Sequence, residues 1–120
     1  VIGGFEGFLK MDHFSTLAAG CRLICGTDDY LGKGLVGPTI PAEYRDSVTH
    51  KPIILEKFVN VGTNVVIMPG VKLAEGTVVG ANSLVTKSTE PWTIYLGSPA
   101  KAVRSRDKVN ILKFSQNLGY

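Results

Sequence analysis

Two kinds of side chain in this 120-residue sequence could take a proton from a hydroxyl or an amine. The imidazoles belong to His13 and His50, and imidazole titrates close to neutral pH. The carboxylates belong to the adjacent Asp28 and Asp29, which are weaker bases. Removing a proton from an attacking group is a step of group transfer. Structural alternatives stay open, because a lone histidine is commonly structural and Asp28-Asp29-Tyr30 is typical of a turn.

The cysteines, the charges and the hydropathy argue against several classes of protein. Cys21 and Cys25 form no CxxC pair and belong to no larger set with histidine, so we expect one buried thiol and one bystander and not a disulfide or a metal pair. The net charge is +3, but basic residues crowd the C-terminal end, which could meet an anion or be a solvated tail. These residues are Lys101, Arg104, Arg106, Lys108 and Lys113. Without a nucleic-acid motif or a long apolar run, we expect a cytoplasmic protein with no nucleic-acid partner and no membrane span.

A six-residue repeat organises the second half of the chain. Every sixth residue from Leu55 is aliphatic: Leu55, Val61, Ile67, Leu73, Val79 and Val85. A second column, four places after each of the first five, is β-branched or small: Val59, Val65, Val71, Thr77 and Ser83. Neither the 3.6-residue period of a helix nor the two-residue period of a strand produces this pattern. The repeat predicts a coil of short parallel strands and tight turns, in which equivalent residues form ladders.

The beginning of the chain follows the same rule, with Phe5, Met11, Leu17 and Leu23 six residues apart. Residues 28–52 break the pattern with prolines and glycines, which predicts a long excursion that leaves the coil and returns to it. A loop of this length is uncommon unless it is functional or disordered. Because the chain begins at Val1 in the middle of the pattern, we expect it to be a fragment.

The repeat ends after Val85. Pro91 and Pro99 argue against regular structure in the segment that follows. The last residues predict one helix with a loose apolar face made by Val109, Leu112 and Leu118. We therefore expect a coil domain over residues 1–103, with its excursion at 28–52, and a basic helix or tail over residues 104–120.

The string IMPGVKLAEGTVVGANSLVTKSTEPWTIYLGSPAKAVRSR resembles the hexapeptide-repeat acyltransferases. It combines a Pro-Gly turn, hexads, a VTK ending and a G-x-P-A-K-x-V-x-x-R tail, and the resemblance extends from Met11 to Arg104. It implies an all-β fold: a left-handed parallel β-helix of about three coils, with a long excursion loop and a short C-terminal helix. It also implies a homotrimer with sites between neighbouring subunits. Galactoside and maltose O-acetyltransferases, and sugar acetyltransferases of surface polysaccharide synthesis, are the most similar types.

The resemblance implies acetyl-CoA as co-substrate and no metal. Exposed main chain at the coil corners suits the pantetheine arm, and lysine and arginine suit the nucleotide phosphates. Carried over residue by residue, the positions that contact coenzyme A are Thr63, Ala81, Thr86, Lys87, Lys101 and Arg104, and the exposed main chain at the coil corner adds Gly80.

The sequence departs from the galactoside type at the catalytic base. That type has a histidine at the end of the motif LAPxxxLxxTGH, whereas LAAGCRLICGTD here places Asp28 at that position. His50, at the end of the excursion, is then our first candidate base, and Asp28 or Asp29 is the alternative. An aspartate base would favour an amino sugar, since such an amine titrates near neutrality and needs little help. His13 stands where relatives have an acidic, sugar-binding residue.

Aromatic and basic residues in the excursion are candidates for binding the acceptor. Tyr30, Tyr44 and Arg45 could stack on a sugar or nucleotide and contact a phosphate or hydroxyl. Alternatively, Tyr44 and Arg45 only anchor the loop. Trp92, the one tryptophan, either covers the core or stacks on the acceptor.

These observations predict an acetyl-CoA-dependent O- or N-acetyltransferase that acts on a sugar or sugar nucleotide in surface polysaccharide synthesis. A γ-carbonic-anhydrase-like hydratase shares the coil but requires three histidine ligands, and the sequence has two. A non-catalytic assembly module is the other alternative. The VTK and PAK residues argue against it, because a scaffold would not require them.

Overall fold

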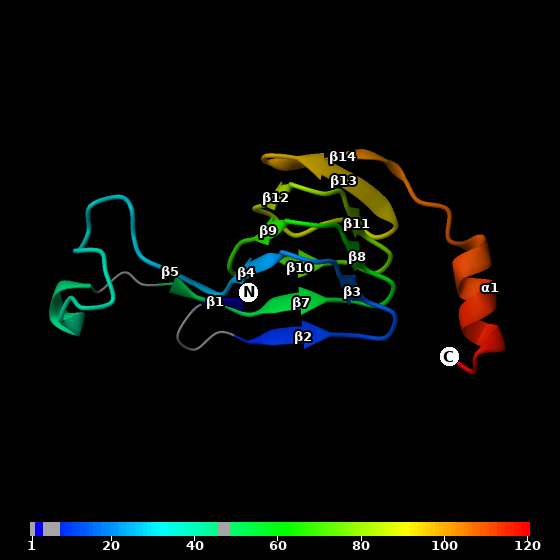
Figure 1. Cartoon of the computed structure of the whole chain (residues 1–120), viewed down its shortest axis with the longest axis horizontal. Coiled ribbons are helices and arrows are strands. Elements are labelled where there is room, and N and C mark those ends of the chain that lie inside the picture. The colour runs from blue at the N-terminus through cyan, green and yellow to red at the C-terminus, as the bar shows by residue number, and fades with distance from the viewer. Residues whose placement is uncertain (1, 4–7, 46–48) are drawn as a thin grey trace.

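A computed structural model describes residues 2–3, 8–45 and 49–120, and its centre is a coil of very short parallel strands (Figure 1). The strands of the coil are β1 (Ile2–Gly3), β2 (Leu9–Met11), β3 (Thr16–Leu17), β4 (Arg22–Ile24), β7 (Ile53–Leu55), β8 (Asn60–Val61), β9 (Val66–Ile67), β10 (Lys72–Leu73), β11 (Val78–Val79) and β12 (Leu84–Val85). They form three sheets: β1-β4-β9-β12, β10-β7-β2, and a third in which β11-β8-β3 continues into two later strands. The chain visits the sheets in succession, so the predicted parallel β-helix is confirmed.

The register between coils equals three hexads of sequence. Leu55 pairs with Leu73, for example, and Val61 pairs with Val79. The whole predicted aliphatic ladder is buried, with exposures of 2% or less: Leu55, Val61, Ile67, Leu73, Val79 and Val85. The second column is buried as well: Val59, Val65, Val71, Thr77 and Ser83. Burying each large aliphatic side chain contributes about 1.5–3 kcal/mol, so these ladders form the core of the fold.

Strands β2 and β3 of the first coil extend the same ladders towards the N-terminal end of the β-helix. Met11 pairs with Leu55 and Leu17 pairs with Val61, as the spacing predicts. Phe5, the predicted start of this ladder, lies outside the described residues. The thiol of Cys21 is buried and donates a hydrogen bond to the carbonyl oxygen of Gly62 at 3.1 Å. Cys25 is also a buried free thiol, so both cysteines belong to the core, where one bystander was expected.

The excursion leaves the coil after β4 and returns at β7. An antiparallel ribbon forms its base, made of β5 (Gly26–Thr27) and β6 (Thr49–His50). The excursion also contains a short 3-10 helix, η1 (Ala42–Tyr44), and it projects to the left of the coil in Figure 1. Residues 46–48 of the predicted segment lie outside the described part. Strand β2 still pairs in parallel with β7, so the excursion leaves the register of the coil intact.

A β-hairpin follows the coil, which makes the prediction of irregular structure after Val85 wrong. Strand β13 (Thr93–Gly97) extends the third sheet in parallel with β11, and β14 (Ala100–Ser105) folds back antiparallel to it. Pro91 precedes the hairpin and Pro99 lies in its turn, and at neither place does a ladder need the missing N–H group. Strand β14 extends beyond residue 103, where the sequence placed the end of the coil domain.

Three aromatic rings lie along one corner of the coil, which we call the aromatic corner: Phe14, Phe58 and Trp92. Gly76 belongs to the same corner. Phe14 stacks on Phe58 with ring centroids 5.4 Å apart, and Trp92 lies 5.7 Å from Phe58. Gly76 has a φ of 75° and lies directly under the indole, where a β-carbon would collide with the ring. Trp92 therefore caps this corner, as expected for a residue that covers the core.

Arg106 fastens the end of the hairpin to the aromatic corner. Its Nη1 donates hydrogen bonds to the carbonyl oxygens of Phe58 at 2.7 Å and Gly76 at 3.0 Å. The guanidinium also lies 5.7 Å from the centre of the Trp92 ring. Burial lowers the pKa of Arg106 from its usual value, because desolvation disfavours the charged form.

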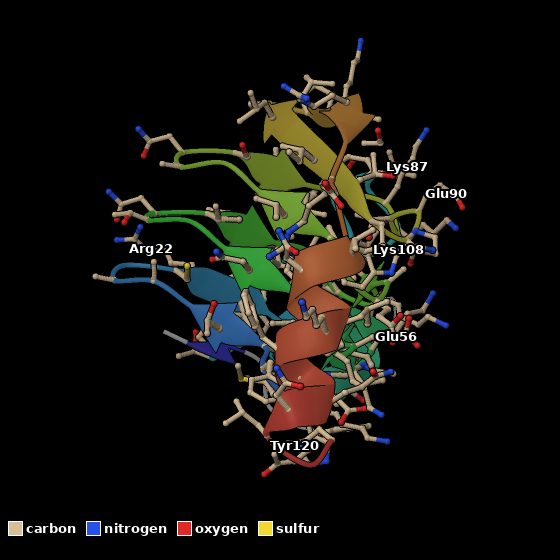
Figure 2. The ribbon with its side chains drawn as sticks, turned by 90° about the vertical axis from the view of Figure 1, so that its right-hand side faces the viewer. Arg22, Glu56, Lys87, Glu90, Lys108 and Tyr120 are labelled. Carbon is tan, nitrogen blue, oxygen red and sulfur yellow. The ribbon has the colours of Figure 1, made fainter. Side chains whose placement is uncertain are left out.

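Helix α1 (Val109–Asn117) packs beside the aromatic corner, with Tyr120 at its foot (Figure 2). The helix is confirmed, but its predicted apolar face is only partly so: Leu112 is half-buried, whereas Val109 is 69% exposed and Leu118 is 68% exposed. Ser115 is the buried residue of the helix. At the chain end, the ring of Tyr120 meets that of Phe14 edge-on at 5.1 Å.

Candidate functional site

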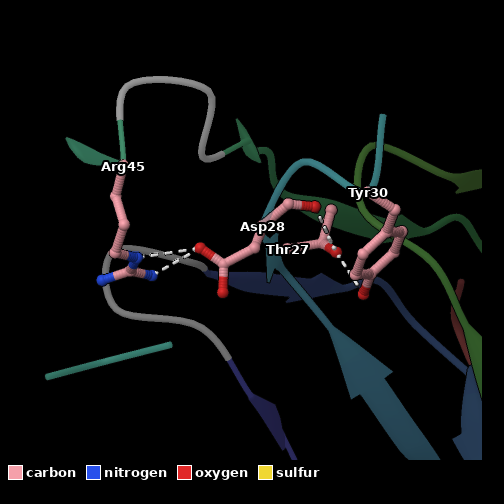
Figure 3. A network of polar contacts seen from close by, with 4 residues as sticks. All are labelled: Thr27, Asp28, Tyr30 and Arg45. Carbon is pink, nitrogen blue, oxygen red and sulfur yellow. Dashed lines mark hydrogen bonds and ion pairs between the residues drawn. The ribbon is translucent and has the colours of Figure 1, made fainter. Parts of the chain in front are cut away.

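The excursion brings Asp28 and Arg45 together (Figure 3). Arg45 donates from Nε at 2.9 Å and from Nη2 at 2.7 Å, and both bonds reach the same oxygen, Oδ1 of Asp28. Both side chains are largely shielded, with 19% of the Arg45 side chain and 17% of the Asp28 side chain exposed. Among the described residues, Oδ2 of Asp28 has no hydrogen-bond partner. One carboxylate oxygen is therefore fixed, and the other can accept a hydrogen bond from a ligand.

The residues around Asp28 form a small polar network. The Thr27 hydroxyl lies 2.8 Å from the Tyr30 hydroxyl, to which it donates (Figure 3). Asp29 accepts the backbone N–H of Lys33 at 2.8 Å, which is the local turn that the sequence left open. The Tyr30 ring remains 76% exposed. Sequence reasoning did not single out Thr27, and its one signal was a hydroxyl immediately before the acidic pair.

Tyr44 and Arg45, the other residues of the excursion predicted to bind the acceptor substrate, differ in how accessible their side chains are to a ligand. The Tyr44 ring is 56% exposed, while the Tyr44 backbone carbonyl accepts the N–H of Leu35 at 2.7 Å. Arg45 uses two of its nitrogens on Asp28, so they are not free for a phosphate. Tyr44 also lines a shallow pocket with Gly32, Gly34 and Glu43.

His50 lies in the ribbon at the base of the excursion. It pairs with Gly26, and the β5 strand that contains Gly26 leads into Asp28 two residues later. The His50 residue is exposed. The fold therefore brings the two candidate bases of the excursion, His50 and Asp28, to the same ribbon.

His13 lies on the other side of the molecule. Its ring centroid is 5.1 Å from that of Tyr120, beside α1, whereas the excursion projects from the opposite side of the coil (Figure 1). It lines a cavity of about 190 Å³ with Phe14, Phe58 and Tyr120. Within one chain, His13 therefore does not join the other candidates of the acceptor site.

Three predicted coenzyme-binding residues meet at one corner of the coil. Thr63 and Ala81 occupy equivalent positions in successive coils, and the Thr63 carbonyl accepts the N–H of Asn82 at 2.9 Å. The Gly80 N–H is not available to a ligand, because it donates to the Tyr95 carbonyl at 2.9 Å. Ala81 is exposed, and its N–H has no partner among the residues that the structure describes. Its free donor fits a carbonyl of a pantetheine arm.

The four remaining predicted coenzyme-binding residues lie on two other parts of the surface. Thr86 and Lys87 are exposed at the far end of β12 from Ala81, and Figure 2 shows Lys87 at the edge of the coil. Lys101 and Arg104 are exposed on β14. Lys101 pairs with Leu96, whose side chain packs on Gly80, so Lys101 lies close to the Ala81 corner.

The described residues contain no group of three or more His, Cys, Asp or Glu side chains that could hold a metal ion. In the same part of the chain, none of the helical structure is long and apolar enough to cross a membrane.

The chain is similar to known acyltransferases of sugar nucleotides. It is 26% identical over 103 residues to dTDP-4-amino-4,6-dideoxy-D-glucose acyltransferase of Escherichia coli. The matched region covers 86% of this chain and 53% of that enzyme. It matches AntD, an N-acyltransferase from Bacillus cereus solved in complex with dTDP and 3-hydroxybutyryl-CoA, with a TM-score of 0.90 and 32% identity. That match covers 98% of this chain and 61% of AntD.

A galactoside acetyltransferase in complex with coenzyme A matches with a TM-score of 0.68 at 24% identity, over 86% of this chain and 48% of that one. At that identity the likeness shows the fold alone. The chain spans about half the length of the E. coli relative, and no protein-family model matches it. The stacked hexads and the match to AntD over nearly the whole chain lead to one assignment: the chain belongs to the hexapeptide-repeat acyltransferases.

Proposed function

We propose that this chain carries the catalytic coil of an acyl-CoA-dependent N-acyltransferase, which transfers an acyl group to the amino group of a nucleotide-linked amino sugar. The observation that carries the proposal is the carboxylate of Asp28, which Arg45 holds at 2.7 Å through one oxygen. Its other oxygen has no partner among the described residues. We place the activity in the synthesis of surface polysaccharide.

The choice of an amine over a hydroxyl follows from the chemistry of Asp28. A carboxylate is too weak a base to deprotonate a sugar hydroxyl, whereas a sugar amine is partly neutral at physiological pH and needs far less help. The known relatives support the same choice, since the E. coli enzyme acts on a dTDP-linked amino sugar and AntD is an N-acyltransferase solved with dTDP.

The reaction needs one proton acceptor and no covalent enzyme intermediate. The neutral amine nitrogen attacks the thioester carbonyl carbon, and the C–N bond forms as the C–S bond breaks. Oδ2 of Asp28 accepts an N–H of the amine, orients its lone pair, and receives the proton that the nitrogen loses. That proton ends on the sulfur of coenzyme A, so the products are an amide and a free thiol. Backbone donors at a coil corner would stabilise the oxyanion.

The coenzyme fits the exposed residues of the coil corners. The free N–H of Ala81 can bind the pantetheine arm, with Thr63 and Thr86 beside the same sheet. Lys87, Lys101 and Arg104 would neutralise the phosphates. These groups lie apart on one chain, and we propose that a homotrimer combines them, with each site between neighbouring copies. His13 would then face the acceptor of an adjacent copy.

A thiol-release assay tests this proposal. Acetyl-CoA and 3-hydroxybutyryl-CoA are each presented with dTDP-4-amino-4,6-dideoxyglucose and with hydroxyl sugars and their nucleotide forms. We expect release of coenzyme A with the amino sugar nucleotide only. Asp28→Asn should lower kcat by roughly 10²–10⁴-fold, as expected for loss of a general base. His50→Ala should lower it less than tenfold.

Three results would count against the proposal. Efficient acylation of a simple hydroxyl sugar, with none of an amino sugar, would make the chain an O-acyltransferase. Loss of activity in His50→Ala with retention in Asp28→Asn would assign the base to His50. Failure to bind any acyl-CoA would favour a non-catalytic coil. Lys72→Gln, which breaks the exposed ion pair with Glu56 on the coil, serves as the matched control.

A further inference from the structure

We infer that Arg45 is a positioning residue for acyl transfer, and that it acts through Asp28 and not by contact with the nucleotide. This inference rests on the proposed function. It gives the excursion a defined role, because Arg45 stands near the end of that segment and Asp28 stands at its beginning.

The geometry of the ion pair favours orientation over simple charge pairing. Two donors of one planar guanidinium converge on Oδ1 of Asp28 at 2.7 and 2.9 Å. Two converging donors hold Oδ1 against the edge of the guanidinium, which restricts the carboxylate more than a single ammonium contact does. Among the residues that the structure describes, Oδ2 has no hydrogen-bond partner, so an incoming amine can use it as an acceptor.

The position of Asp28 makes this orientation necessary. Asp28 follows the last residue of β5, so its backbone lies outside the β5–β6 ladder, and the Thr27 hydroxyl donates to its carbonyl oxygen at 3.2 Å. Arg45 comes from 17 positions further along the chain, immediately after η1. The backbone N–H of Arg45 donates to the Ala42 carbonyl at 3.1 Å, which ties the arginine to that short helix. The conformation of the excursion therefore sets the direction of the Asp28 carboxylate.

Misplacing a reacting group by about 1 Å can cost on the order of 10² in rate. We therefore expect Arg45→Gln to lower kcat by roughly 10–100-fold while the KM values for acyl-CoA and the nucleotide sugar change less than about threefold. Arg45→Lys should recover only part of this loss, since it restores the charge without the two converging donors.

A double-mutant cycle separates positioning from the alternatives. If Arg45 acts only through Asp28, the Asp28→Asn/Arg45→Gln protein should be no slower than Asp28→Asn alone, within about threefold. Lys72→Gln breaks the exposed 3.7 Å ion pair with Glu56, touches neither Asp28 nor Arg45, and should leave kcat unchanged. Thermal unfolding of every variant shows whether the fold is retained, and Arg45→Lys replaces Arg45→Gln in the cycle if the latter unfolds.

Each outcome decides between defined alternatives. Losses that multiply in the double variant would mean that Arg45 acts independently of Asp28. A tenfold or larger rise in the KM for the nucleotide sugar, with kcat intact, would make Arg45 a substrate contact. Unimpaired transfer by Arg45→Gln would contradict the positioning role of Arg45 but leave the proposed function intact. Absence of transfer by the unaltered protein would contradict the proposed function and this role with it.

Discussion

The side chain of Leu96 fills the space that a β-carbon on Gly80 would need. The backbone is equally close, since the Gly80 N–H donates to the carbonyl of Tyr95 at 2.9 Å. Strand β13 is thus pressed onto the last full coil at the corner that also presents Ala81. The capping hairpin and the candidate coenzyme corner therefore share one contact.

Replacing Gly80 by alanine should loosen this contact. The new methyl group overlaps the end of the flexible, half-exposed Leu96 side chain, which can move aside, so the cost should be about 1 kcal/mol, the low end for overpacking. We expect a lower midpoint of urea unfolding for Gly80→Ala. Leu96 is 47% exposed and its removal should cost little by itself, so Gly80→Ala/Leu96→Ala should recover most of the stability. If the double variant is as unstable as the two losses added together, the contact does not explain the glycine.

Neighbouring residues of β10 should differ sharply in their contribution to stability. Leu73 is fully buried in the ladder, and Leu→Ala in a core costs about 2–5 kcal/mol in unfolding free energy. Lys72 points outwards and makes one exposed ion pair, so Lys72→Ala should cost about 1 kcal/mol or less. Urea unfolding of both variants checks the period of six directly. Similar losses at the two positions would contradict the inward assignment of Leu73.

Arg106→Gln should detach the C-terminal segment from the aromatic corner. The change removes the charged donor to the carbonyls of Phe58 and Gly76 and the contact with Trp92. Hydrogen bonds from charged groups contribute about 1.5–3 kcal/mol, so we expect a drop in thermal stability and faster amide exchange in α1. Lys108→Gln, two residues later and exposed, is the control. Unchanged exchange in α1 would mean that Tyr120 alone holds the helix.

Lys101→Gln and Arg104→Gln should weaken binding of acyl-CoA and leave kcat nearly unchanged. If these side chains contact the nucleotide phosphates, each loss should raise the KM for acyl-CoA roughly three- to thirtyfold, a range set by charge-assisted hydrogen bonds at an exposed site. Initial rates at varied acyl-CoA concentration measure this. Lys113→Gln on α1 removes the same charge and should have no such effect. An equal rise in the KM for all three variants would indicate a general effect of net charge.

The coil could be predicted from the sequence because its information is local and repeated. Each hexad places an aliphatic residue inwards, and ladder pairs such as Leu55 and Leu73 lie a fixed interval apart. No partner from a distant segment had to be known. The capping hairpin was missed because Pro91 and Pro99 flank its strands and do not interrupt them.

The candidate site was only partly predictable. The motif position of Asp28 and the basic residues of β14 were visible in the sequence. The ion pair between Asp28 and Arg45 was not, because the excursion has no periodicity that could align two residues 17 positions apart. The packing of α1 was predicted only in part, since the contacts of the Tyr120 ring with His13 and Phe14 join residues more than 100 positions apart.

The antiparallel ribbon of β5 and β6 gives the excursion paired entry and exit strands, while the coils below and above it remain stacked. The excursion is therefore an insertion that leaves the stacking of the β-helix coils unchanged. Exchanging it for the equivalent segment of another member should transplant acceptor preference and leave the donor corner untouched. Enzymes of this kind could diversify in the same way, because changes in the excursion would alter the acceptor while the β-helix keeps its structure.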